Sequence, residues 1–219
     1  MKAKPKTTTT RSGQGKVMAK TKQPSPSIVK KIQSLAKIAA DLRQGKDYNI
    51  TRLTIIKGLC ADPDAAAKFV VYIAKLAQRQ FRAQRSKATT RKQYGQLIGA
   101  AVPVMARYLK SPTEKMESKL REMHQRARDA QSRVEHQQWG DVRIIECWEL
   151  LIVETAMECL LNPWHASLIG YQVARKYAQR YDSHYGTGLI PKSAPMVEEI
   201  AEFWGSHYLG RGWRKKVER

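Results

Sequence analysis

Acidic side chains are missing from two long stretches of this 219-residue chain, residues 1–40 and 65–113, and each stretch carries ten lysines and arginines. Residues 1–113 together hold 24 of the 40 basic residues but 4 of the 19 acidic ones, a net charge of +20, whereas residues 114–219 are nearly neutral. A protein whose charge serves solubility alone mixes both signs over its surface. The separation therefore indicates a polyanionic partner, of which nucleic acid is the commonest.

Cysteine is scarce, and long uncharged apolar runs are missing. The three cysteines, Cys60, Cys147 and Cys159, lie in apolar surroundings, which excludes a disulfide framework and predicts buried free thiols. We expect a reducing compartment, cytoplasmic or nucleoid-associated. The most apolar stretch, residues 144–161, is interrupted by four glutamates, so we expect no membrane span.

Motifs for catalysis and cofactor binding are missing as well. Neither Gly-x-x-x-x-Gly-Lys-Ser/Thr nor Gly-x-Gly-x-x-Gly occurs, so the chain offers no phosphate cradle of those kinds. A di-metal site in a helical bundle uses Glu-x-x-His, which is also absent, so Glu146, Glu149, Glu154 and Glu158 are expected to pair with bases of neighbouring helices or to be exposed. Cys159 lies in a Met/Leu run that does not suit an activated thiolate. We expect a non-enzyme without metal or cofactor.

Alternation typical of strands is missing, and apolar residues recur every three or four positions. The sequence therefore predicts an all-α protein of about seven helices in an orthogonal or bundle-like body. A helix is also predicted over residues 94–108, and Pro103 within it is expected to kink or divide this helix. Helix starts are marked by a capping residue followed by proline, at Ser25-Pro26, Asp62-Pro63 and Ser111-Pro112.

Composition divides the chain into four parts. Residues 1–25 predict a disordered basic arm, and residues 26–110 a basic helical half that binds nucleic acid. Residues 111–209 predict a near-neutral structural half, and residues 210–219 a basic tail. An organellar transit peptide is the alternative for the arm, but such peptides favour arginine, and this segment has six lysines and one arginine.

The third predicted helix, from residue 63 to about residue 85, carries the best candidate site. A helical period of about 100° per residue places its basic residues and one tyrosine in a narrow stripe. An acid-free basic stripe is typical of a helix that lies along a phosphate backbone, although it could also be an ordinary solvated face. The stripe and its continuation are Lys68, Tyr72, Lys75, Arg79, Arg82, Arg85, Lys87, Arg91 and Lys92.

The C-terminal tail is the second candidate, because it places an aromatic ring among basic residues and glycines. Trp213 could stack on an unpaired base while its neighbours contact phosphate. It could equally pack onto the last helix beside Trp204 and Tyr208. The candidate residues of the tail are Arg211, Trp213, Arg214, Lys215 and Lys216.

The sequence thus favours a non-catalytic nucleic-acid-binding subunit of a ribonucleoprotein or nucleoprotein assembly. RNA is favoured over DNA because a flexible arm and stacking aromatics suit irregular, single-stranded targets. A helical scaffold that docks on acidic proteins is the alternative, with a heptad seam in residues 116–134 and the apolar helix 142–161 as its interface. Attachment to an anionic membrane is weaker, because the basic helices lack a separate apolar face.

Overall fold

A computed structural model describes residues 24–83, 89–137, 148–179 and 188–217 of the chain. Within these residues it contains nine α-helices and one pair of two-residue antiparallel strands, in which Tyr48 lies opposite Leu189. The elements are α1 (Pro26–Arg43), β1 (Tyr48–Asn49), α2 (Ile55–Leu59), α3 (Pro63–Ala83), α4 (Thr89–Lys110), α5 (Glu114–Gln137), α6 (Trp148–Leu161), α7 (Ala166–Ala178), β2 (Gly188–Leu189), α8 (Ala194–Leu209) and α9 (Trp213–Val217).

The all-α prediction is confirmed, but the predicted helix count is too low. Nine α-helices form in the described part of the chain, and one of them, α9, consists of residues expected in the tail. Pro103 lies inside the single helix α4, so it does not divide that helix. Most of the predicted arm lies outside the described residues. No helix in the described part is long and apolar enough to cross a membrane.

Local capping chemistry explains where the helices begin. The Ser25 hydroxyl accepts a hydrogen bond from the Ile28 amide at 3.4 Å, and Pro26 occupies the first turn of α1. The Asp62 carboxylate accepts the Asp64 amide at 3.0 Å at the start of α3. In α5 the capping residue is Thr113, two residues later than Ser111, and its hydroxyl accepts the Met116 amide at 3.3 Å.

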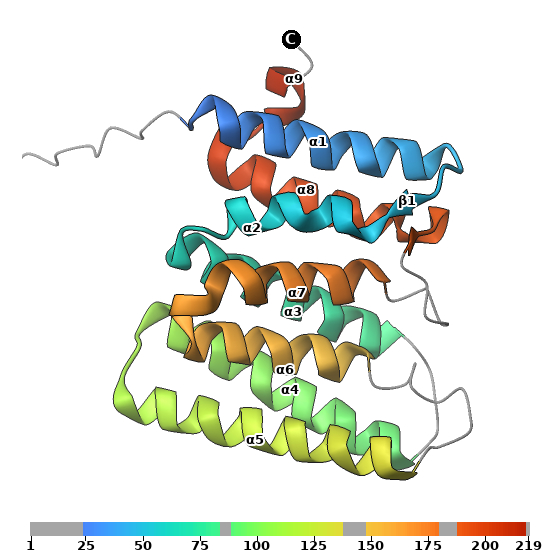
Figure 1. The fold of residues 1–219 in the computed structure, drawn as a ribbon. Coiled ribbons are helices and arrows are strands. Elements are labelled where there is room, and N and C mark those ends of the chain that lie inside the picture. Colours follow the sequence, from blue (N-terminus) through green and yellow to red (C-terminus); the bar gives the residue numbers. More distant parts are fainter. Residues whose placement is uncertain (1–23, 84–88, 138–147, 180–187, 218–219) are drawn as a thin grey trace, which may run out of the picture.

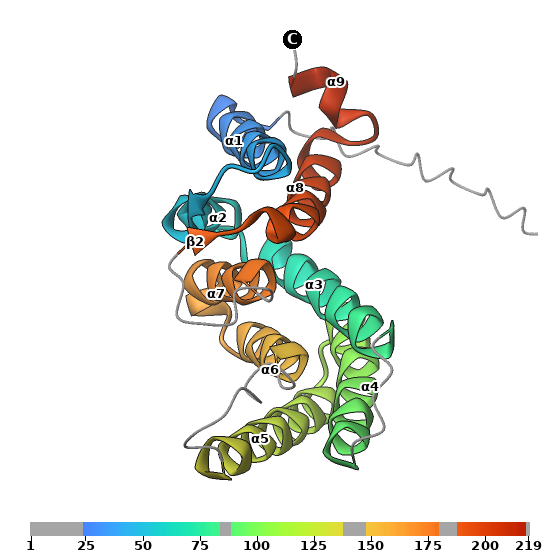
Figure 2. The same cartoon turned by 90° about the vertical axis from the view of Figure 1, so that its right-hand side faces the viewer.

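The helices form two layers, which Figure 2 shows as two columns and Figure 1 shows one in front of the other. One layer contains α1, α2, α7, α6 and α5 in that order, and the other contains α8, α3 and α4. Much of the packing crosses between them: α1 lies on α8, α3 lies on α6 and α7, and α4 lies on α5, while α6 and α7 pack on each other within one layer. The basic N-terminal helices and the near-neutral C-terminal helices therefore share one hydrophobic core.

The chain end is packed into this core through a single tryptophan. Gly210 and Gly212 have φ angles of +75° and +71°, which turn the chain so that α9 folds back on α8. The Trp213 ring is 2% exposed and its Nε1 donates to Glu202 Oε2 at 3.0 Å. Gln33 of α1 donates to the Val217 carbonyl at 2.8 Å, so α9 also contacts the first helix.

Gly205 makes this packing possible, because a Cβ at this position would overlap the Trp213 indole. We expect Gly205→Ala to lower the free energy of unfolding by about 1–3 kcal/mol, the usual cost of overpacking. Denaturant unfolding followed by circular dichroism measures it. Gly99→Ala is the matched control: Gly99 is also in a helix, nothing lies within 4 Å of its added Cβ, and the variant should keep or gain stability. Equal stability of the two variants would contradict the close packing of Trp213.

Candidate nucleic-acid interface

The basic stripe of α3 is exposed, as its spacing predicts. Ten residues of the helix are buried, among them Phe69, Ile73 and Ala77. Lys75, Arg79 and Arg82 are exposed on the opposite side. The helical period separates the two sets, so the residues that fix α3 in the core also orient the basic ones toward solvent.

The charges in this stripe differ in how far they are already neutralised. Lys68, at the N-terminal end, forms an ion pair with Asp64 one turn earlier at 2.5 Å. Lys75, Arg79 and Arg82 form no ion pair with any residue that the structure describes. Because an exposed pair such as Lys68–Asp64 contributes roughly 0–1 kcal/mol, it weakens phosphate binding there without abolishing it.

Tyr72 has a packing role in this structure. Its half-buried ring lies with its centroid 5.2 Å from that of Phe203 in α8, at an interplanar angle of 35°. Burial, followed by the nearby charge of Glu199, raises the pKa of the Tyr72 phenol. The contact with Phe203 thus joins α3 to α8, and the half-buried ring keeps part of its surface exposed.

The continuation of the stripe is described in part. Arg85 and Lys87 lie outside the described residues, and the Arg91 side chain does too, although its backbone belongs to α4. Lys92 is exposed. The candidate residues chosen from the sequence did not include Arg107 and Lys110, which are exposed near the end of α4. Both lie in the acid-free stretch 65–113, which could have pointed to them.

The prediction that Trp213 stacks on a base is wrong for this structure. The ring is 2% exposed, so a base cannot reach its face, and the alternative of a core plug is the one found. Arg211, Lys215 and Lys216 are exposed, and Lys216 also donates to the Leu209 carbonyl at 2.5 Å. The guanidinium of Arg214 lies 5.3 Å from the Trp213 ring centroid and 3.6 Å from the Glu202 carboxylate.

Acidic residues of α8 stand between the two basic candidates. Glu202 bonds Trp213 and Arg214, and both Glu202 and Glu199 act electrostatically on Tyr72 of α3. Glu199 also accepts a hydrogen bond from the Tyr177 hydroxyl. The α3 stripe and the tail thus border one acidic patch, which also reaches the C-terminal half of α3, because Gln80 donates to the same Tyr177 hydroxyl at 2.9 Å.

A buried polar cluster lies elsewhere, between α5, α6 and α7. His124 Nε2 lies 3.1 Å from Glu154 Oε1, and Lys176 donates to Thr155 Oγ1 at 2.7 Å. Burial acts to raise the pKa of the Glu154 carboxyl, but the bond from His124 and the charges of His124 and Lys176 outweigh burial and hold the pKa below its ordinary value. Burial lowers the pKa of Lys176. Pairing of Glu154 with a base on a neighbouring helix agrees with the expectation from sequence.

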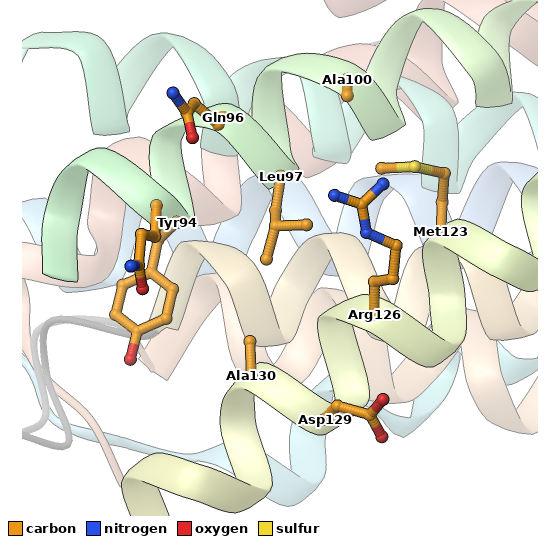
Figure 3. A pocket seen from close by; sticks show the side chains of 9 residues that line it. Tyr94, Gln96, Leu97, Ala100, Met123, Arg126, Asp129 and Ala130 are labelled. Atoms are coloured by element: carbon orange, nitrogen blue, oxygen red, sulfur yellow. The ribbon is translucent and has the colours of Figure 1, made fainter.

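Other features that could support chemistry are limited in the described part. Cys60 and Cys159 are buried free thiols, and burial raises the pKa of Cys159 to about 12, so this thiol stays protonated at neutral pH. A groove of about 450 Å³ lies between α4 and α5, with Leu97 and Met123 in its wall and Arg126 reaching across it (Figure 3).

No protein-family model matches the chain, and neither the curated proteins nor the solved structures contain a match to it. The fold and the charges define a helical protein with a basic stripe on its central helix. Its function is therefore argued from the described residues themselves.

The interaction of Glu154 with His124 makes the free energy of unfolding depend on pH. A carboxyl whose pKa is lower in the folded protein stabilises the fold above its unfolded pKa, and this contribution is lost as pH falls through the folded value. We expect the free energy of unfolding to fall below about pH 4.5, the ordinary value of this group. Glu154→Gln should flatten that decline, whereas Glu117→Gln, at an exposed pair with Arg121, should leave it unchanged. Identical pH profiles for Glu154→Gln and the parent would refute the assignment.

Proposed function

We propose that this protein is a non-catalytic nucleic-acid-binding subunit of a ribonucleoprotein or nucleoprotein assembly in a reducing compartment. The observation that carries the proposal is the exposed set Lys75, Arg79 and Arg82, which face solvent from a rigid helix and have no ion pair within the described residues. Three adjacent cations without acidic partners repel one another, and a polyanion relieves that repulsion.

The spacing of these residues suits a phosphate backbone. At 1.5 Å per residue, Lys75 to Arg82 spans roughly 10 Å along α3, the length of about three phosphates of one strand at a rise of about 3.4 Å. Contacts to phosphate carry affinity without sequence information. The proposed stripe therefore binds the backbone, and exposed Lys92, Arg107 and Lys110 of α4 extend the basic surface of the same acid-free stretch.

RNA is favoured over duplex DNA as the ligand. A recognition helix in the major groove contacts base edges with its N-terminal residues. The N-terminus of α3 carries Asp62 and Asp64, which would repel a duplex entering there. The basic residues of α3 that have no ion pair within the described residues, Lys75, Arg79 and Arg82, lie in its C-terminal half, which suits backbone contact to an irregular or single-stranded target.

A scaffold that docks on acidic proteins is the second candidate. Its predicted interface is disfavoured, because Leu120, Met123 and Ala127 of the heptad seam are buried against the chain's own helices. A different surface supports it: Trp164 is 91% exposed and Leu168 is 46% exposed beside the start of α7. Exposed apolar side chains of this size are typical of protein contacts. Nucleic acid that copurifies and is removed by nuclease would favour the first proposal over this one.

The stripe is tested by the triple variant Lys75→Glu, Arg79→Glu and Arg82→Glu. We expect weaker binding to labelled single-stranded RNA of any sequence, with a loss that shrinks as salt rises, because log affinity falls with log salt in proportion to the phosphates contacted. Three lost contacts should flatten that slope by about two units for a single strand. Fluorescence anisotropy at several salt concentrations measures both quantities.

A matched control separates the stripe from net charge. Lys115→Glu, Lys119→Glu and Lys192→Glu change the net charge equally at exposed positions on α5 and before α8. This control should keep most of the affinity and the parent's salt slope, and both triple variants should keep the parent's circular dichroism. If the two variants bind equally, total charge governs binding and the stripe is a solvated face.

The predicted arm is tested by deleting residues 1–23, which removes seven basic residues. Affinity for RNA should drop, and the salt slope should flatten by up to about five units if each base contacts phosphate of a single strand. The thermal midpoint should stay nearly unchanged, because the segment has almost no apolar residues to bury. A large loss of stability would show that the segment packs into the fold, and an unchanged slope would point instead to targeting.

A further inference from the structure

Three potential metal ligands converge between α5 and α6. His124 projects from α5, and Glu154 and Glu158 project from α6 one turn apart. One donor atom from each of the three lies within 4.8 Å of the other two. The two helices pack side by side (Figure 1). The set therefore joins two consecutive helices, with His124 and Glu154 separated by 30 positions in the sequence.

The two carboxylates of this cluster differ in how they are partnered. Glu154 is 9% exposed and bonds His124 and Thr155, whereas the half-buried carboxylate of Glu158 has no hydrogen bond or ion pair within the described residues. The Lys176 ammonium acts electrostatically on both glutamates, and it donates its hydrogen bond to Thr155. Within the described residues the Glu158 carboxylate is thus open to a further cation, and its partial burial favours one.

The donor set identifies the cation. Imidazole nitrogen together with carboxylate oxygens suits zinc and related divalent transition ions, whereas magnesium and calcium prefer oxygen alone. Donors around a tetrahedral ion with bonds of about 2.0–2.2 Å lie roughly 3.4 Å apart. His124 and Glu154 are already at 3.1 Å, and the donor oxygen of Glu158 lies within 4.8 Å of both.

We propose that His124, Glu154 and Glu158 bind one zinc-class divalent cation, with water as the fourth ligand. The ion fastens α5 to α6 and neutralises the unpaired Glu158. The site is independent of the proposed nucleic-acid interface, because none of its ligands belongs to α3, α4 or α9.

The test is titration of the full chain with Zn²⁺ after removal of metal by a chelator. Calorimetry should show one bound ion per chain, and the thermal midpoint should rise with Zn²⁺ because the ion binds the folded state. Co²⁺ should give the visible absorption of a four-coordinate site. Loss of a direct ligand in Glu158→Gln should weaken Zn²⁺ binding by at least the roughly 10- to 100-fold typical of losing an outer-shell partner.

Two variants make the result specific. Glu158→Gln leaves the His124–Glu154 bond in place and should fold as the parent does, so weaker binding reports the lost ligand. Glu122→Gln, which removes an exposed carboxylate of α5 paired with Arg126, should bind Zn²⁺ like the parent. Absence of stoichiometric binding by the parent would overturn the proposal, and so would equal affinity of Glu158→Gln and the parent.

Discussion

Burial of the apolar face of α3 is the interaction on which the rest of this structure depends. The helix contacts α4, α6, α7 and α8, so it belongs to both layers' packing and connects helices from both halves of the sequence. Its ring contacts, from Phe69 to Phe203 and Trp204, join it to α8 with centroid separations of 5.3 and 4.9 Å. Fully burying a side chain of this kind contributes about 1.5–3 kcal/mol, and α3 buries ten residues.

The same burial determines what α3 can present to a partner. A helix enclosed on most sides has one narrow strip left for solvent, and in α3 that strip holds Lys75, Arg79 and Arg82. The charged side chains of such a helix lie on this strip because an unpaired charge buried in the core would be costly. The position of the basic stripe is therefore a result of packing, and its lack of acidic partners is the feature that packing does not explain.

Local signals in the sequence were sufficient for the features that a single helix determines. The Asp62-Pro63 start and the basic stripe of α3 follow from capping chemistry and helical period, and the structure has both. The sequence left two roles open for Trp213 and could not decide between them, because burial of the ring depends on Gly205 leaving space on a different helix. The His124–Glu154 contact depends on the register of α5 against α6, and the β1–β2 pair is too short for alternation to show. These three features are contacts between two elements, and the sequence of one element alone does not determine how it packs against another.

Packing of α1 against α8 also affects the protein during its synthesis. Arg43 of α1 pairs with Glu198 of α8, 155 residues later, and Gln33 bonds the Val217 carbonyl, 184 residues later. A ribosome adds about 5–20 residues per second, so the apolar side of α1 waits for many seconds before its partner has been made. During that interval Ile32, Leu35 and Leu42, all 0% exposed in the finished fold, are open to other chains. Packing of α1 against α8 is thus a late event in translation, and until then the apolar side of α1 is exposed to aggregation.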